Sequence, residues 1–320
     1  MTKRLTMAAV LLLSATAAGA QGYPSKPITL VVPFAAGGPS DAYMRQLSVV
    51  MGRQLKQTIV VENVPGGGGT IGPARVARAA PDGYTLLNHN LGVATYPALF
   101  RSLEYNILTD FDYIGTLTFD PSVLMARADF PANGFAEFLA YVKANQAKIS
   151  FGDGGGPSLL SALLFMAHTG TKMTLVPYKG TGPAMTDLIA KHIDLLSNSS
   201  SVVAPHVRSG KVKAIGITGK IRVSNLPDVP TLDEQGLKGF EMVVWQAVFA
   251  PRGLPKPIQG RLVAAYQASI EDPDMQAHFR KTGGVPATRE QATPAALQAL
   301  VKSEVEKWGA LLKKAGIKPQ

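Results

Sequence analysis

The chain has 320 residues, and 32 Lys and Arg against 22 Asp and Glu give it a formal net charge of +10. It has no cysteine, which excludes disulfides, thiolate zinc sites and cysteine nucleophiles. Aromatic residues make up 7% and the basic residues are scattered, so the charge indicates a mild preference for anions, and we expect no nucleic-acid partner.

The first twenty residues have the pattern of a secretory signal peptide. Lys3 and Arg4 give a positive start, and the apolar stretch at 7–13 is too short to span a bilayer. The small residues AGA at 18–20 fit a cleavage site. We therefore expect export, cleavage after Ala20 and a periplasmic location. The alternative is an apolar N-terminal helix that stays in the fold.

After this segment the chain alternates strands and helices. The first block predicts strands at 27–33, 58–62 and 84–87, with helices at 41–55 and 74–80. The second block predicts strands at 148–151, 173–177, 193–196 and 212–217, with helices at 158–168 and 185–190. Residues 257–316 are mostly helical, with a break around 282–286. This alternation is typical of parallel sheets covered by helices, and therefore of an α/β protein.

Two long extended stretches, 113–127 and 240–251, join the blocks. Interpreted as paired crossovers, they make the second block an insertion within the first. The predicted domain 1 comprises residues 21–119 and 250–320, and the predicted domain 2 comprises residues 120–249.

Glycine-containing loops join strand ends to helix starts at 33–41, 65–73, 152–158 and 177–184. In open α/β sheets ligands bind at such edges, where free backbone N–H groups and the helix dipole favour an anion. In the first loop Gly37 and Gly38 would allow close approach of the backbone, and Ser40 or Asp41 would be the helix N-cap. The alternative is a simple connecting turn.

The second loop contains the spacing Gly67-x-Gly69-x-x-Gly72 of the dinucleotide fingerprint. The match is weak, because Asp82 lies only ten residues beyond Gly72, whereas the ribose-binding acid is expected about twenty residues on. Export also argues against a nicotinamide enzyme. We expect no cofactor.

The fourth loop offers a carboxylate the Tyr178 phenol and the Lys179 ammonium group. The alternatives are a solvated charge for Lys179 and core packing for Tyr178.

Catalytic signatures are largely absent. The sequence has no H-E-x-x-H, no G-x-S-x-G and no P-loop motif, and its five histidines lack metal-ligand spacing. His89 follows a predicted strand end and is a candidate pocket residue. We predict no catalytic residue, no metal site and no enzyme activity.

Taken together, the loops resemble those of the solute receptors of tripartite tricarboxylate transporters, also called Bug or TctC-like receptors. The resemblance spans nearly all of the mature chain, through the segments YPSKPITLVVPFAAGGPSD, VVENVPGGGGTIGPARVARAAPDGYTLL, VPYKGTGPAMTDLIAKHIDLL and LPDVPTLDEQG. It implies a two-domain, type II-like periplasmic binding protein. Each domain would be a mainly parallel sheet flanked by helices, joined to the other by two crossover strands, with a cleft between them.

The resemblance also implies a carboxylate held between loops of both domains, partly through ordered waters. Segment 88–95 would line the distal end of the pocket, and Trp245 would be either a stacking wall or hinge packing. The ligand-binding residues predicted in this way are Phe34, Ala36, Gly37, Gly38, Ser40, Asp41, His89, Asn90, Gly155, Gly156, Ser158, Tyr178, Lys179, Gly180, Asn198 and Trp245.

Three segments depart from the family pattern. Relatives often read T-H-A-x-N-P where this chain has NLGVATYP, and S-S-G-N-G-S where it has GDGGGPS. They also often read F-D-N where this chain has LSN, which keeps Asn198 and loses the acid. These changes alter the polarity of the site and leave the identity of the ligand open.

The sequence therefore predicts a monomeric receptor that binds a di- or tricarboxylate or an aromatic acid. It would deliver this ligand to integral membrane transporter subunits. Two alternatives remain at this point: a sensor that signals to a membrane partner, and an exported hydrolase.

Overall fold

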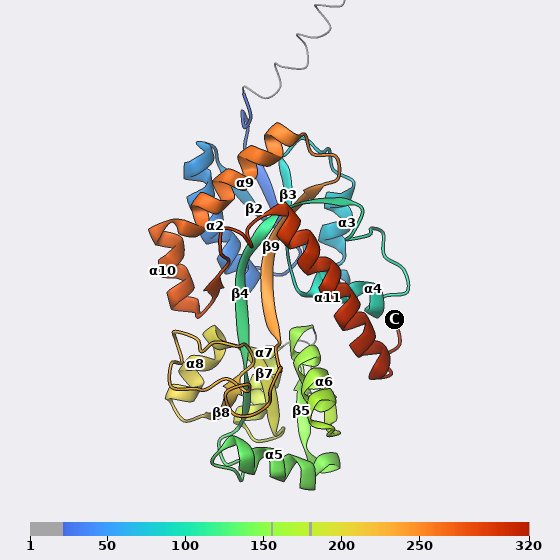
Figure 1. Ribbon diagram of the computed structural model, residues 1–320, viewed down its shortest axis with the longest axis vertical. Coiled ribbons are helices and arrows are strands. Elements are labelled where there is room, and N and C mark those ends of the chain that lie inside the picture. Colours follow the sequence, from blue (N-terminus) through green and yellow to red (C-terminus); the bar gives the residue numbers. More distant parts are fainter. Residues whose placement is uncertain (1–21, 155, 179–180, 320) are drawn as a thin grey trace, which may run out of the picture.

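The computed structural model describes residues 22–154, 156–178 and 181–319. The predicted signal peptide and the predicted site residues Gly155, Lys179 and Gly180 lie outside them. Figure 1 shows two lobes, one above the other, joined by two long strands. Among the described residues, no helix is both long and apolar enough to cross a membrane.

The first lobe is built on three parallel strands with β1 in the middle. They are β1 (Ile28–Val32), β2 (Ile59–Asn63) and β3 (Thr85–Asn90). Helices and one 3-10 turn surround them: α2 (Pro39–Leu55), η1 (Gly67–Gly69), α3 (Ile71–Ala77), α4 (Gly92–Leu99), α9 (Lys256–Glu271), α10 (Pro273–Thr282) and α11 (Pro294–Lys314).

The second lobe has three parallel strands of its own, β5 (Ser150–Asp153), β6 (Thr174–Pro177) and β7 (Leu195–Ser199). A fourth strand, β8 (Val212–Ile217), is antiparallel to one of the joining strands. The helical segments are α5 (Phe135–Ala144), η2 (Gln146–Lys148), α6 (Pro157–Thr169), α7 (Thr181–Ile189) and α8 (Ser200–Arg208).

The joining strands are β4 (Phe111–Arg127) and β9 (Val243–Pro251). They pair antiparallel from Phe111 opposite Pro251 to Pro121 opposite Val243. β3 pairs with β9, β7 and β8 pair with the far end of β4, and the short β10 (Val285–Pro286) pairs with the middle of β4. One continuous sheet therefore runs through both lobes.

The core explains why these segments form these elements. β1 is covered on both faces: Leu30 belongs to the apolar cluster under α2, and Val31 belongs to the cluster on the opposite side. Its continuous apolar run is typical of a parallel strand buried on both faces. The predicted stripe of α2 is confirmed, because all its members are at most 3% exposed: Met44, Leu47, Val50, Met51 and Leu55.

The predicted α/β class, with mainly parallel sheets, flanking helices and two crossover strands, is confirmed. The break at 282–286 is also found, between α10 and β10. The domain boundaries remain a prediction. They fall at residues 119/120 and 249/250, inside the uninterrupted strands β4 and β9.

Three helices, α4, α5 and α8, were not predicted. α4 carries Pro97 in its interior, and its first five residues are all buried, so it lacks the one-sided apolar stripe that marks a surface helix. The predicted N-cap of α2 was wrong. Pro39 occupies the first helical turn, where its fixed φ is favourable, and the N-cap is therefore Gly38 rather than Ser40 or Asp41.

Candidate ligand-binding site

The register of β4 shows how the two lobes face each other. The carboxyl end of β3, Asn90, pairs with Gln246, which in turn lies opposite Thr118 of β4. The carboxyl end of β7, Ser199, lies opposite Ser122 of the same strand, and β7 runs in the reverse direction. The two strand ends therefore point towards each other. Measured along β4, they are four residues apart, which is roughly 13 Å at about 3.3 Å per residue.

In the first lobe, the loop after β1 leads directly into α2. Ala36 and Gly37 are exposed, Phe34 and Gly38 are half-buried, and Gly37 has a positive φ of 85°. No side chain caps α2. Its first backbone N–H groups are therefore available to an anion, which the positive end of the helix dipole also favours.

Asp41, a predicted ligand residue, directs its carboxylate at the loop itself. It accepts hydrogen bonds from Gly37 N, Arg45 Nε and Asn63 Nδ2, each 2.9 Å long. Burial raises the pKa of Asp41, but the bonds from Arg45, Gly37 and Asn63 outweigh burial and hold it below its ordinary value. The side chain, 4% exposed, therefore fixes the shape of the loop.

In the second lobe, α6 begins in the same way as α2. Gly38-Pro39-Ser40 opens α2 and Gly156-Pro157-Ser158 opens α6, and neither helix has a side-chain cap. Gly156 has φ 48° and ψ −122°, a conformation that glycine adopts most readily. The buried Ser158 hydroxyl donates to Gly152 O at 3.0 Å, which ties the start of α6 back to β5.

A buried polar cluster joins α2 to the joining strand β9. Ser40 Oγ donates to Gln246 Oε1 at 3.1 Å, and Asn88 Nδ2 donates to the same oxygen at 3.3 Å. All three side chains are at most 5% exposed. Sequence reasoning missed Gln246, whose available signal was a polar residue inside the predicted extended stretch 240–251. Asn88 belongs to the segment 88–95, which the family resemblance places at the distal end of the pocket.

His89 contacts Phe34 and Gly69, which lie in the first and second glycine-containing loops, and is fully buried. Its ring packs edge-on against Phe34 and Tyr96, with 5.3 Å between ring centres in each pair. Nδ1 lies 2.9 Å from Asn90 N and 3.1 Å from Asn90 O, and Nε2 lies 3.4 Å from Gly69 O. Burial lowers the pKa of His89 to about 4, so the ring is neutral. Its role is to pack against Phe34 and Tyr96.

The remaining predicted residues lie at strand ends with their polar groups engaged. Asn90 Oδ1 accepts from Gly92 N, and Asn198 Oδ1 accepts from Ser199 N. The half-buried Tyr178 donates from its hydroxyl to Asp187 Oδ2 at 2.7 Å.

Trp245 is 2% exposed and belongs to the apolar core, and its indole N–H has no partner among the described residues. This location agrees with the packing role that the sequence left open.

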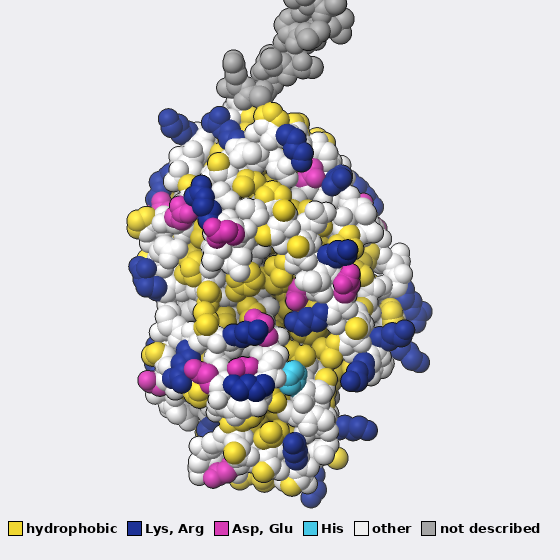
Figure 2. All heavy atoms as spheres, in the orientation of Figure 1, with side chains coloured by type: hydrophobic (Ala, Val, Ile, Leu, Met, Phe, Trp, Pro, Cys, Tyr) yellow, Lys and Arg dark blue, Asp and Glu magenta, His cyan; other side chains and the backbone are white. Residues whose placement is uncertain are grey.

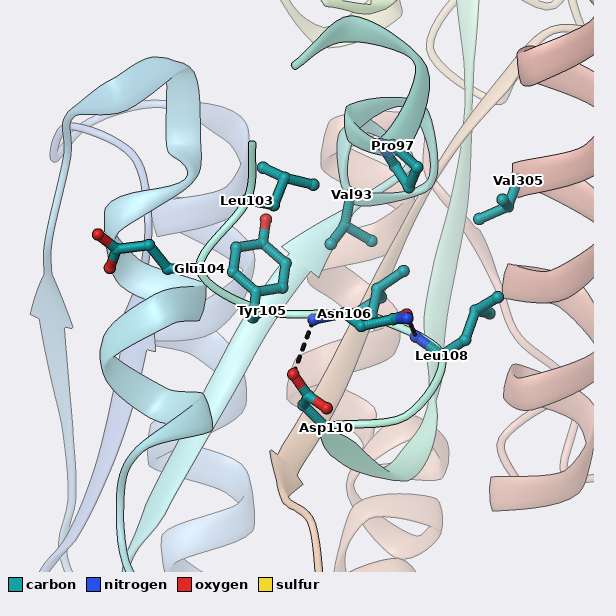
Figure 3. Close-up of a pocket in the computed structure, with 10 residues that line it drawn as sticks. Val93, Pro97, Leu103, Glu104, Tyr105, Asn106, Leu108, Asp110 and Val305 are labelled. Atoms are coloured by element: carbon teal, nitrogen blue, oxygen red, sulfur yellow. Dashed lines mark hydrogen bonds between the residues drawn. The ribbon is translucent and has the colours of Figure 1, made fainter. Parts of the chain in front are cut away.

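The large cavity drawn in Figure 3 lies elsewhere, between α4, the segment 103–110 and α11, and has a volume of about 580 Å³. Its carboxylates already have partners: Glu104 pairs with Arg78, and Asp110 accepts from Asn106 N at 2.8 Å. These acids disfavour an organic anion, and none of the predicted site residues lines this cavity.

Charge is spread over the face of the molecule seen in Figure 2, as the sequence indicates. In Figure 2 the dark blue Lys and Arg side chains lie over both lobes and alternate with magenta acidic groups. The described residues contain no cluster of three or more acidic, histidine or cysteine side chains able to hold a metal ion.

The fold is that of a two-lobed solute-binding protein. The family model of the tripartite tricarboxylate transporter family receptor matches residues 43–317, and the chain belongs to this family. Family members are solute-binding receptors of the periplasm.

Relatives match over almost their full length. A UPF0065 protein of Agrobacterium vitis is 43% identical over 92% of this chain and 86% of its own length. BugT of Bordetella pertussis is 30% identical over 99% of both chains.

Solved structures superpose closely. The periplasmic binding protein BugD has a TM-score of 0.81 at 43% identity, covering 93% of this chain and all of its own. MatC from Rhodopseudomonas palustris with bound malate has a TM-score of 0.79 at 37% identity, over 91% of this chain and all of its own. An adipate-bound protein of R. palustris has a TM-score of 0.82 at 28% identity, over 93% of this chain and all of its own.

Proposed function

We propose that this protein is an extracytoplasmic receptor that binds a small organic carboxylate between its lobes. The observation that carries the proposal is the approach of the carboxyl ends of β3 and β7 along β4. Their parallel neighbours, β1 and β5, each lead through a glycine-containing loop into a helix. On each side a helix opens with the same Gly-Pro-Ser sequence and no side-chain cap. Two uncapped helix starts that serve one cleft suit a ligand with an anionic group at one or both ends.

The recognition groups are then mainly backbone amides. The 34–38 loop presents exposed glycine and alanine backbone, and Asp41 holds that loop in shape. Gln246 adds a side-chain donor: its oxygen is occupied by Ser40 and Asn88, which leaves its Nε2 without a partner among the described residues. Lys179 and Gly180 of the fourth loop remain predicted contacts.

Closure would come from bending of β4 and β9, the strands that cross between the lobes. The two predicted domains are the moving bodies in this proposal. The malate and adipate held by two structural relatives support a dicarboxylate as the ligand class. Export through the predicted signal peptide and delivery to membrane transporter subunits complete the proposed role.

A receptor is favoured over a hydrolase by the state of His89. This histidine is buried and neutral, with Nδ1 bonded to Asn90 N and Nε2 facing Gly69 O, so it is not placed as a general base.

The test is calorimetry of the mature protein against malate, adipate, citrate and terephthalate. Adipamide is the matched control, because it keeps the length of adipate and removes both charges. Binding of at least one acid, with no heat from its neutral analogue, is expected. Absence of binding to every acid, or turnover of a bound acid, would count against the receptor role.

A further inference from the structure

The C-terminal end of α10, in the first lobe, meets two segments of the second lobe. Ser200 Oγ and Asn225 Nδ2 both donate to the carbonyl of Thr282, at 3.3 and 3.2 Å. Ser224 Oγ donates to the carbonyl of Arg280 at 3.1 Å. The last carbonyls of a helix have no N–H partner within it, so these three side chains satisfy acceptors that the helix leaves open.

The contact is close because Gly283 follows α10. Its φ of 79° is a conformation that favours glycine, and a β-carbon there would collide with Asn225 and Ser200. Ser200 is 2% exposed, so the contact is a packed one.

The same end of α10 is bonded to the elements that carry the proposed site. Thr282 Oγ1 lies 2.8 Å from the hydroxyl of Tyr43, which donates to Asp120 Oδ1 of β4 at 2.7 Å. Tyr43 lies one turn after Ser40 in α2, the helix that follows the first ligand loop. Ser200 opens α8 directly after β7. The bonds at Thr282 therefore connect the elements that would close on a ligand from the two lobes.

We propose that the Ser200, Ser224 and Asn225 bonds to the end of α10 form an interlobe latch, made when the lobes are closed and broken when they separate. The inference rests on the proposed function, in that it requires the lobes to open and close. Removing two such bonds shifts the closed-to-open ratio about thirtyfold. Apparent ligand affinity falls in proportion to the closed fraction.

The test measures lobe separation without any ligand. Because the chain has no cysteine, Val49→Cys in α2 and Lys172→Cys beside β6 give two unique sites for spin labels. Pulsed electron paramagnetic resonance of Ser200→Ala/Asn225→Ala should show the ratio of short to long distances falling about thirtyfold. Using Ser200→Thr in place of Ser200→Ala keeps the hydroxyl. The short distance should then be populated again.

The matched control is Ser303→Ala/Asn145→Ala. It removes one serine and one asparagine bond to the carbonyls of Leu300 and Tyr141, each within a single lobe. Its distances should equal those of the labelled parent. A latch variant that matches this control, or that shifts to shorter distances, overturns the proposal. If the double variant does not fold, Ser224→Ala at the exposed bond replaces it, with a smaller shift expected.

Calorimetry with malate and adipate on the same variants keeps the two ideas separate. A latch variant should bind the acid that the parent binds with an affinity lowered by up to about thirtyfold, and the control should bind it as the parent does. If the parent binds neither acid, the calorimetry counts against the proposed function, and the distance measurement still decides on the latch.

Discussion

Ser40 and Gln246 are 206 residues apart in the sequence, yet the serine hydroxyl donates to the glutamine side-chain oxygen at 3.1 Å. The bond ties the first turn of α2 to the strand β9, which crosses between the lobes. It fixes the end of the 34–38 loop relative to the strand that bends in the proposed closure.

Gln246→Leu should therefore destabilise the protein. The substitution leaves the buried Ser40 hydroxyl and the Asn88 amide without their shared acceptor, at a cost of about 1–3 kcal/mol. Urea unfolding followed by circular dichroism measures it. Gln54→Leu, at an exposed position of α2, is the control and should change the unfolding free energy by less than about 0.5 kcal/mol. Equal stability of the two variants would contradict the structural role of the cluster.

Asp41→Ala should loosen the ligand loop. Gly37 N, Arg45 and Asn63 lose their common acceptor, and we expect a loss of about 2 kcal/mol in stability, together with weaker carboxylate binding. Since the folded-state pKa of Asp41 is lowered, its stabilisation is present above the unfolded pKa near 3.8 and is lost as pH falls through the folded value.

Unfolding of the Asp41 variant and its parent at pH 7 and at pH 3 checks the sign, because the difference between them should shrink in acid. Asp228→Ala serves as the control. Its carboxylate is exposed and should matter little at either pH.

Asp120 should make the protein less stable as pH rises. Burial raises its pKa from 3.8 to about 7, against the opposing hydrogen bonds from Tyr43 and Thr118. The folded state then holds a proton that the unfolded state releases, so stability falls between about pH 4 and pH 7 and is level above that, by roughly 4 kcal/mol at most.

Asp120→Asn should remove this decline, and urea unfolding at several pH values from 4.5 to 8 reports it. A variant whose stability falls with pH as steeply as the parent's would show that another group is responsible.

His89 should have the opposite effect to Asp120 and make the protein more stable as pH rises. Burial lowers its pKa from 6.5 to about 4, so the unfolded state binds the proton more tightly. Its contribution is complete above pH 6.5 and is lost as pH falls towards 4. Nuclear magnetic resonance of the ring nitrogens should show a neutral ring with no titration between pH 5.5 and 8. A midpoint near 6.5 would refute the buried, neutral state.

Much of the fold follows from local pattern. The apolar runs of β1 and β4, the stripe of α2 and the glycine loops at strand ends are readable from neighbouring residues alone. α4 was not readable, because burial of its first five residues removes the periodicity on which such predictions rest. Pro39 shifted the start of α2 because proline is favoured in a first helical turn.

The sequence by itself determined the alternation of strands and helices, the likeness to the receptor family and the loops that would carry a ligand. Only the tertiary structure decided which polar groups meet. In the folded protein the Asp41 carboxylate bonds to its own loop, and Gln246 bonds to Ser40. His89 is buried and neutral. The physical reason is that such contacts depend on the pairing register of distant strands, and a shift of one residue in β9 would turn Gln246 to the opposite face of the sheet.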